Sequence, residues 1–499
     1  MHAAHAAPSA IVPSAYQLAI FRDVEEGAGH TVIVARAGSG KTTTILRALT
    51  FLPVGARSLF VAFNKTIADE LTARVPAGVR AATLHSFGYA QLRRAGFNVG
   101  APDKFKTHTI LDALLSPTNR ENKERCASLV RVVSLAKGAL AHTAPAIDAL
   151  MDEFTIDLNN ASADDATRAT DRAQFIRTAI EVLRLSREEY STTIDFDDMI
   201  WLPIVLDLPI AQFDYVFIDE TQDLNAAQIE LSVRACKFPS GRIIAVGDDR
   251  QAIYAFRGAD SSALPSLVKR LRAKVLPLSV TYRCARAIVA VAKRIVPDLE
   301  AAPNAIEGDV SASSWAAMVE GAAPGDFVLS RTNAPLIGLC MQFLAEGRRA
   351  SIQGKDLAKD LLSMLRRSKA ANVDAFLVYL DAWAGAETRR MLARKPVAGD
   401  TGAIDDKVTC LRTLCEGAQS IAEVTARIES LFSDDDNAAR IVLSTTHKAK
   451  GLERDRVWML AGTYARGMDS DEGQNLYYVA VTRARKALVM VADKPKGAQ

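Results

Sequence analysis

Residues 31–42 read TVIVARAGSGKT, and this order of residues constrains the fold more than any other feature of the chain. A run typical of a buried strand leads into a glycine-containing loop, after which Lys41 and Thr42 open a helical pattern. A strand, a glycine loop and a helix N-terminus in this order direct backbone N–H groups and the helix dipole toward a phosphate. Lys41 would neutralise β- and γ-phosphates, and Thr42 would offer its hydroxyl to Mg²⁺. The segment therefore predicts a phosphate-binding loop, although Ala35 stands where the usual pattern has its first glycine.

The charge balance and the positions of the cysteines limit which kinds of surface and site this protein is expected to have. Among the 499 residues, 61 Lys and Arg nearly offset 58 Asp and Glu, so any cationic surface must be local. The cysteines are Cys126, Cys236, Cys284, Cys340, Cys410 and Cys415. They form no C-x-x-C pair and have no nearby histidines, which argues against a zinc ribbon, an iron–sulfur cluster or a disulfide framework.

No segment predicts export or insertion into a membrane. The first twelve residues are rich in alanine but lack the basic region and apolar core of a signal peptide. The apolar stretch 199–210 is too short to span a bilayer and is interrupted by Pro203, Asp207 and Pro209. We therefore expect a cytoplasmic enzyme with no membrane partner.

Short apolar runs that alternate with helical patterns predict an α/β fold with parallel sheets. These runs show little alternation of polar and apolar residues, as expected for strands covered on both faces. The expected strands are 31–34, 58–63, 214–218, 242–246, 326–330, 441–444 and 456–460. Helical periodicity fills residues 101–190 and 355–435, and its apolar stripes are interpreted as packing faces. The pattern predicts two α/β cores, each with one mainly helical insertion.

Two later segments carry groups that suit a nucleotide site. Residues 215–223 read YVFIDETQD and place Asp219 and Glu220 just past a buried strand, at the sheet edge where phosphate loops lie. Asp219 would hold the Mg²⁺ shell, and Glu220 would polarise an attacking water. Residues 243–260 read IIAVGDDRQAIYAFRGAD, in which Gln251 is a neutral side chain able to orient that water. Together with the lysine loop, these groups predict hydrolysis of a nucleoside triphosphate.

In this order, the segments resemble the motifs of superfamily 1A helicases of the UvrD/Rep type. The matching segments are Tyr16 with Gln17, the lysine loop, LFVAFNKTIADEL (59–71), TLHSF (83–87), IDFDDM (194–199), DETQD (219–223), GDDRQAIYAFRGAD (247–260), TYR (281–283), STTHKAKGLE (444–453) and YYVAVTRAR (477–485). The family often tolerates alanine at the position of Ala35. Phe256 replaces the usual tryptophan, and Arg454 replaces a common aromatic residue. The amino-acid sequences of several of these segments resemble those of the F-box-helicase branch and of compact phage-like relatives.

The resemblance implies that ATP and Mg²⁺ are bound by groups from two RecA-like cores. The implied catalytic residues are Lys41, Glu220, Gln251, Arg283 and Arg483. The implied nucleotide-binding residues are Gln17, Ala37, Gly38, Ser39, Gly40, Lys41, Thr42, Thr43, Tyr282, Arg283, Glu453 and Arg483. Thr42 and Asp219 are the implied metal ligands, while Tyr282 would stack on adenine and Glu453 would reach the ribose. A guanidinium is always charged and grips phosphate oxygens bidentately, which suits the two arginines.

The resemblance also implies binding of single-stranded DNA and of junctions between single-stranded and duplex DNA. The implied DNA-binding residues are Phe63, Asn64, Lys65, His85, Ser86, Tyr254, Phe256, Arg257, His447 and Lys450. Stacking of a base on an aromatic ring is worth about 1–3 kcal/mol and tolerates any sequence, so a chain of low net charge can still hold one strand. Stacking does not by itself distinguish DNA from RNA.

The resemblance predicts the domain organisation as well. Residues 1–100 with 191–275 would form the first core, and 101–190 would form its helical insertion. Residues 276–354 with 436–499 would form the second core, and 355–435 would form its small helical insertion.

The implied function is that of an ATP-dependent single-stranded DNA translocase and 3′–5′ DNA helicase, with ATP hydrolysed between the two cores. Two alternatives stay open. A DNA-stimulated ATPase would strip proteins from single strands without unwinding, an alternative suggested by the short insertions. Alternatively, the chain would be the ATPase subunit of a repair, recombination or phage-defence complex whose nuclease is a separate protein.

Overall fold

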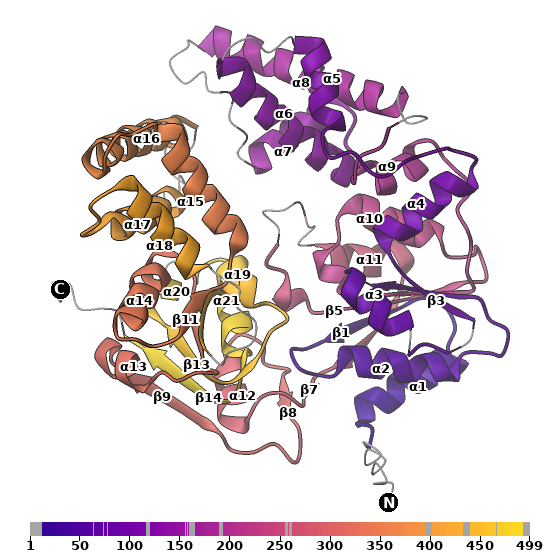
Figure 1. The fold of residues 1–499 in the computed structure, drawn as a ribbon. Coiled ribbons are helices and arrows are strands. Elements are labelled where there is room, and N and C mark those ends of the chain that lie inside the picture. Colours follow the sequence, from indigo (N-terminus) through magenta and orange to yellow (C-terminus); the bar gives the residue numbers. More distant parts are fainter. Residues whose placement is uncertain are drawn as a thin grey trace, which may run out of the picture. The chain divides into compact units, whose positions relative to one another are not determined.

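Two six-stranded parallel sheets organise the protein, as seen in a computed structural model (Figure 1). The structure describes residues 12–492 apart from 63, 73, 77, 116–119, 155, 157, 159–164, 189–192, 255–257, 259–261, 395–401, 433–439 and 466. The chain divides into two compact units. The first comprises Met1–Ile156, Gln174–Asp249 and Tyr254–Tyr282, and the second comprises Asp157–Ala173, Arg250–Ile253 and Arg283–Gln499.

The sheet of the first unit has the strand order β3-β2-β4-β5-β1-β6, and every neighbouring pair is parallel. Its strands are β1 (Thr31–Ala35), β2 (Ser58–Ala62), β3 (Val79–Thr83), β4 (Tyr215–Ile218), β5 (Arg242–Gly247) and β6 (Lys274–Leu278). The four inner strands coincide with expected strands. The edge strands β3 and β6 were not predicted, because edge strands carry exposed residues and tolerate a proline such as Pro277.

Alternate residues of the inner strands face two separate hydrophobic cores. On β1, Val32 packs into one core and Ile33 into the other, and on β2 the same division separates Leu59 from Phe60. Both faces of the sheet are thus apolar, which explains why these strands lack polar alternation in the sequence.

Helices connect and cover these strands. They are α1 (Ala15–Glu26), α2 (Lys41–Ala48), α3 (Lys65–Thr72), α4 (Leu84–Arg94), α9 (Asp198–Val205), α10 (Ala226–Arg234) and α11 (Ala263–Leu271), with the short 3₁₀ turns η1 (Leu49–Phe51), η3 (Thr221–Asp223) and η4 (Asp249–Gln251). Helices α4 and α9 approach each other closely at Gly88. A Cβ atom there would lie 2.0 Å from the carbonyl oxygen of Met199, so the approach requires glycine.

Helices also fill the stretch 101–190, as expected. They are α5 (Lys106–Leu115), α6 (Arg120–Ala139), α7 (Ala144–Glu153) and α8 (Asp165–Glu188), which lie together in Figure 1. Their apolar stripes are packing faces, because Val132 and Val133 of α6 and Ala179 and Val182 of α8 are buried.

The sheet of the second unit has the order β11-β12-β10-β13-β14-β9 and is likewise parallel throughout. Its strands are β9 (Asp309–Ser313), β10 (Phe327–Ser330), β11 (Ala350–Ile352), β12 (Ile441–Thr445), β13 (Arg454–Leu460) and β14 (Ala484–Val491). The short strands β7 (Val280–Thr281) and β8 (Glu300–Ala301) lie outside both large sheets. Strands β10, β12 and β13 were expected, whereas the edge strands β9 and β11 and the half-polar strand β14 were not.

The helices of the second unit include the second expected helical stretch. They are α12 (Arg286–Ala292), α13 (Trp315–Gly321), α14 (Ala334–Ala345), α15 (Lys355–Ser368), α16 (Val373–Arg394), α17 (Gly402–Cys415), α18 (Ile421–Leu431), α19 (Thr446–Ala449), α20 (Gly462–Ala465) and α21 (Asp471–Val481). Helices α15 to α18, drawn in orange, lie together in Figure 1. Leu361 and Leu365 of α15 and Phe376 and Leu380 of α16 belong to the core, so these stripes are also packing faces.

The observed architecture confirms the predicted α/β class with two parallel-sheet cores and helical insertions. All six cysteines are buried free thiols. In the part of the chain that the structure describes, no helix has both the length and the apolar character needed to cross a membrane.

Candidate active site

The loop between β1 and α2 has the geometry of a phosphate cradle. Gly38 and Gly40 adopt left-handed backbone angles (φ 72° and 76°), which turn the chain sharply between strand and helix. Ser39 is fully buried, and its hydroxyl has no hydrogen-bond partner among the described residues, which fits a loop that binds a polar ligand. Ala35 is the last residue of the extended strand β1, so its backbone needs no glycine. The other predicted residues of this segment are Ala37, which is buried, Thr42, which is partly buried, and Thr43, which is exposed.

Lys41 and two carboxylates beyond β4 form a compact charged group. The Lys41 ammonium lies 2.8 Å from each carboxylate oxygen of Glu220. Burial lowers the pKa of Lys41, but the charges of Glu220, Asp219 and Asp248 outweigh it and raise that pKa, so the lysine stays protonated. Burial and the charge of Glu220 raise the pKa of Asp219 to about 7, and a bound cation would favour its ionised form. The structure therefore brings together the three charged residues that the sequence singled out.

Gln222 links two segments of this site. Its Nε2 donates to Glu220 Oε2 at 2.6 Å, and its Oε1 accepts from the Asp248 N–H at 3.0 Å. Glu220 itself has a left-handed backbone (φ 49°), a conformation that is costly for a residue with a side chain and that is often found at functional sites. Gln222 therefore holds the Glu220 carboxylate relative to the end of β5. The sequence of the DETQD segment alone does not mark this glutamine as a site residue.

A buried arginine ties the phosphate loop to the same strand end. Arg36 Nη1 lies 3.1 Å from Asp248 Oδ1 and 2.6 Å from Asp249 Oδ1, and Asp248 is fully buried. These ion pairs hold Arg36, at the start of the lysine loop, against the two aspartates that follow β5. Nothing in the local pattern marked Arg36 as more than a loop residue, since its partners lie more than 200 positions away in the sequence.

Gln17 and Tyr282 lie beside the phosphate loop. Gln17 Nε2 donates to Thr44 Oγ1 on α2 at 2.9 Å, and its Oε1 accepts from the Ser14 N–H at 2.9 Å, completing a cap of α1. The Tyr282 N–H donates to the Gly38 carbonyl at 2.8 Å, while its side chain is 44% exposed. An exposed ring anchored beside the loop suits stacking on a base, and the adenine roles of both residues stay predictions.

In the second unit, Arg283 and Arg483 lie near Glu453. Arg283 forms an ion pair with Glu453. Arg483 is 1% exposed, and its Nε donates to the Val479 carbonyl at 2.9 Å while its Nη1 donates to the Leu452 carbonyl at 3.2 Å. Burial, and then the charge of Arg283, lower the pKa of Arg483 to about 10, so the guanidinium is still charged at neutral pH. A second guanidinium beside the Arg283–Glu453 ion pair adds positive charge, which suits an anionic ligand.

Gln251 belongs to the second unit and is held by other groups of that same unit. The Lys450 ammonium donates to the Gln251 carbonyl at 2.7 Å, and Asn475 Nδ2 donates to the Ala252 carbonyl at 3.2 Å. The Gln251 side chain is largely buried. Lys450, which was predicted to contact DNA, thus has a local role that the sequence did not reveal: it fastens the segment that carries the predicted water-orienting glutamine.

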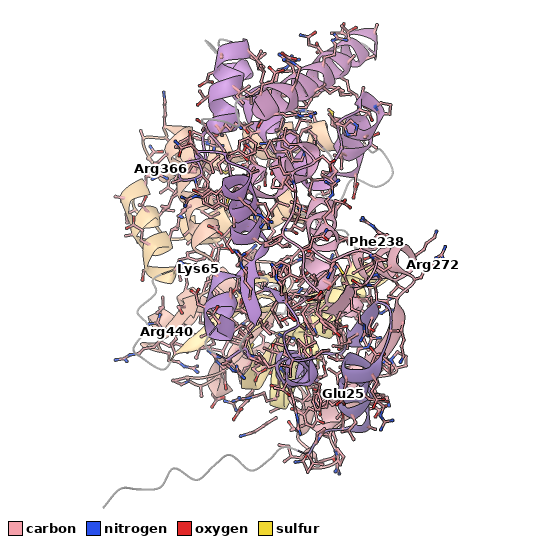
Figure 2. All side chains as sticks on the ribbon, turned by 90° about the vertical axis from the view of Figure 1, so that its right-hand side faces the viewer. Glu25, Lys65, Phe238, Arg272, Arg366 and Arg440 are labelled. Carbon is pink, nitrogen blue, oxygen red and sulfur yellow. The ribbon has the colours of Figure 1, made fainter. Side chains whose placement is uncertain are left out.

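The predicted DNA-binding residues come from several loops and helix starts. In the first unit, Asn64 and Lys65 are exposed at the start of α3, where Asn64 Oδ1 accepts from the Ile67 N–H at 2.8 Å (Lys65 is labelled in Figure 2). His85 and Ser86 lie in the first turn of α4, and Ser86 donates its hydroxyl hydrogen to the Thr83 carbonyl. Tyr254 and, in the second unit, His447 are partly buried. Phe63, Phe256 and Arg257 lie outside the described residues.

One exposed aromatic residue was missed. Phe196, within the IDFDDM segment, is 56% exposed, and its ring meets that of His85 edge-on with centroids 6.4 Å apart and planes at 69°. An exposed phenylalanine beside a predicted DNA-binding histidine is a candidate stacking surface. The sequence offered one signal, an aromatic residue flanked by aspartates, but sequence alone did not show that its ring is exposed.

Two family models match this chain. Residues 19–271 match the UvrD/REP helicase N-terminal domain, which covers the lysine loop, Asp219, Glu220 and Gln251. The chain belongs to the UvrD/Rep helicase family. Residues 440–491 match the UvrD-like helicase C-terminal domain, so the two parallel-sheet units correspond to the RecA-like cores of this family.

Full-length relatives of this UvrD/Rep-family chain are larger. F-box DNA helicase protein 1 of Schizosaccharomyces pombe is 24% identical over 92% of this chain and 55% of the relative. F-box DNA helicase 1 of Gallus gallus is 24% identical over 92% of this chain and 47% of the relative. The ATP-dependent DNA helicase PcrA of Staphylococcus aureus is 30% identical over 54% of this chain and 38% of the relative. The chain thus spans about half the length, or less, of these curated relatives.

Proposed function

We propose that this protein is an ATP-dependent translocase on single-stranded DNA and a 3′–5′ DNA helicase. The observation that carries the proposal is the group formed by Lys41, Asp219 and Glu220 beside a glycine loop, because P-loop enzymes use this combination to hydrolyse a nucleoside triphosphate. The relatives that are named DNA helicases support DNA as the nucleic acid along which the protein moves. The 3′–5′ polarity rests on the resemblance of residues 444–453 and 477–485 to UvrD-type motifs.

In this proposal the first unit binds the triphosphate. Lys41 would neutralise the β- and γ-phosphates, and the backbone N–H groups of the loop would face their oxygens. Mg²⁺ would be held by Thr42 and Asp219 together with phosphate oxygens. The buried Asp219 carboxylate and the free Ser39 hydroxyl fit this ligand. Mg²⁺, when bound, would screen the charge that develops on the phosphates.

The hydrolytic step needs groups from both units. Glu220 would polarise the attacking water, and Gln251 would orient it toward the γ-phosphate. Arg283 and Arg483 would stabilise the charge that develops there, a role worth on the order of 10³-fold or more in rate for an arginine supplied in cis. ATP would then favour one arrangement of the two units, and loss of the γ-phosphate would release it, since only differential affinity for two states converts hydrolysis into movement.

DNA binding in this proposal depends on exposed rings and a few cations rather than on net charge. Phe196 and Tyr254 would meet the bases, and His85, Asn64 and Lys65 would meet the phosphates or sugars. Alternating grip by the two units would move the protein along one strand. The domain boundaries predicted above belong to this proposal.

The test measures ATP turnover with single-stranded DNA, duplex DNA and RNA side by side, and then strand displacement on duplexes with 3′ or 5′ tails. We expect single-stranded DNA to stimulate hydrolysis most strongly, chelation of Mg²⁺ to abolish it, and only the 3′-tailed duplex to be unwound. Stimulated hydrolysis without any displacement would favour a translocase that strips proteins from DNA. Hydrolysis that appears only with a co-purifying nuclease would favour the complex subunit. Exclusive unwinding of the 5′-tailed duplex would contradict the polarity.

A further inference from the structure

Two lysines and two aspartates form a buried ionic network where the first helical insertion joins the core. The Lys106 ammonium lies 2.7 Å from Asp198 Oδ2, and it also donates to the Ser186 carbonyl at 2.7 Å. The Lys137 ammonium lies 2.6 Å from Asp195 Oδ2 and 2.8 Å from Asp198 Oδ1. Each lysine is at most 2% exposed, and Asp198 is completely buried.

The network joins several helices to one short turn. Lys106 is the first residue of α5, Lys137 lies in the last turn of α6, and Ser186 lies near the end of α8. Asp195 and Asp198 enclose the turn that opens α9, and each accepts the backbone N–H of the other, at 2.8 and 3.0 Å. Three of the four insertion helices, α5, α6 and α8, are therefore linked through this network to the same four residues of the core, 195–198.

A buried ionic network is energetically less favourable than an apolar interior of the same volume. Taking a charge out of water costs several kcal/mol, and apolar residues of similar volume usually stabilise a fold as well or better. Burial lowers the pKa of Lys137, but the charges of Asp198 and Asp195 outweigh it and raise that pKa, so the network holds ionised groups. Unlike apolar contacts, these charged groups fix a unique, directional geometry for the turn.

The turn carries Phe196 on its outer side. While the two aspartates point into the network, Phe196 is 56% exposed and its ring lies against His85 of α4. Helix α4 packs closely on α9 at this point, because a Cβ atom at Gly88 would lie 2.0 Å from the carbonyl oxygen of Met199. The position of the Phe196 ring is thus set from two sides, by the packing of α4 and by the ionic network.

We propose that Lys106 and Lys137 are positioning residues for DNA binding, which act by holding the 195–198 turn so that Phe196 presents its ring beside His85 to a base of single-stranded DNA. This inference rests on the proposed function. The lysines touch no DNA themselves, and their effect passes entirely through the phenylalanine. It follows that neutralising a lysine weakens DNA binding only as long as Phe196 is present.

The experiment measures the dissociation constant of a fluorescent oligo-dT strand for the full chain, by anisotropy, together with ATP turnover at saturating DNA and the thermal midpoint. We expect Phe196→Ala and Lys137→Gln each to weaken binding about tenfold, the loss of one stacked base. Turnover at saturating DNA should stay within about twofold, because the ATP site is intact. Lys137→Arg, which keeps the charge, should restore much of the affinity.

The decisive variant combines Phe196→Ala with Lys137→Gln. If the lysine acts through the ring, the double variant binds DNA as weakly as Phe196→Ala alone, whereas a general structural defect would add to it. Should Lys137→Gln fail to fold, Asp195→Asn, which keeps the shape of the side chain, takes its place in the same cycle. Arg184→Ala, which breaks an exposed ion-pair group on α8, is the matched control and should bind like the unaltered protein.

Additive losses, or normal DNA binding by the folded Lys137→Gln variant alongside weak binding by Phe196→Ala, would overturn the inference and leave the proposed function standing. Absence of DNA binding by the unaltered protein would instead contradict the proposed function and the inference with it.

Discussion

Replacing Lys41 with alanine should reduce DNA-stimulated ATP hydrolysis by at least about 100-fold. The ammonium lies 2.8 Å from the Glu220 carboxylate, and Lys41 is the first residue of α2. Its removal deprives the phosphates of their counter-charge. It also removes the positive charge that lowers the pKa of Asp219, so this pKa rises further and disfavours the ionised ligand that Mg²⁺ needs. Turnover of ATP at saturating DNA measures the loss.

The matched control for this prediction is Lys237→Ala. Lys237 belongs to the same unit, but its side chain is 55% exposed and its ion pair with Asp214 is long, at 3.5 Å. We expect its removal to leave turnover unchanged, and we expect both variants to keep the circular dichroism and the thermal midpoint of a folded protein. Turnover by Lys41→Ala close to that of the unaltered protein would refute the assignment of the loop.

Replacing Arg483 with alanine should lower turnover by about 10³-fold, because we propose that its guanidinium stabilises the charge that develops on the γ-phosphate. The side chain is buried, and three of its five N–H donors bond within the unit, to Val479, Leu452 and Thr482. The remaining donors are those that a phosphate would meet. The measurement is single-turnover hydrolysis, which separates the chemical step from binding of ATP.

Because removal of a buried side chain also removes packing, Arg483→Lys belongs in the same series. It keeps a charge but not the planar fork that grips oxygens bidentately, so we expect hydrolysis to stay low while the thermal midpoint recovers. Lys486, three positions along, has a side chain that is 60% exposed and pairs with Asp455, so Lys486→Ala serves as the control with near-normal hydrolysis. Equal losses in the Arg483 and Lys486 variants would contradict the specific role of Arg483.

The inner strands and the loop geometry were predictable because their determinants are local. An apolar run without alternation predicts a strand buried on both faces, and a glycine loop before a lysine predicts a turn into a helix. Edge strands were missed for the converse reason: β6 and β9 are largely exposed, and their pairing depends on neighbours far away in the sequence.

The site residues likewise divide into those that the sequence predicts and those that only tertiary contacts reveal. Lys41 and Glu220 meet because the carboxyl ends of parallel strands share one edge of a sheet, a rule that the sequence alone allows one to apply. Lys106 and Lys137 look in the sequence like solvated helix residues, and only the fold shows that they are buried against aspartates about 60 to 90 positions away. Lys450 was predicted to meet DNA from its motif alone, and its hydrogen bond to Gln251 is a tertiary contact that no spacing reveals.

The most direct test of the account is an experimental structure with single-stranded DNA and a non-hydrolysable ATP analogue, in which the distances from the γ-phosphate to the three cations are measured. We predict that Lys41 Nζ and the guanidinium groups of Arg283 and Arg483 all lie within hydrogen-bonding distance, about 3 Å, of γ-phosphate oxygens. An analogue bound by Lys41 with both arginines turned away from it would contradict the central claim that one triphosphate is shared by the two units.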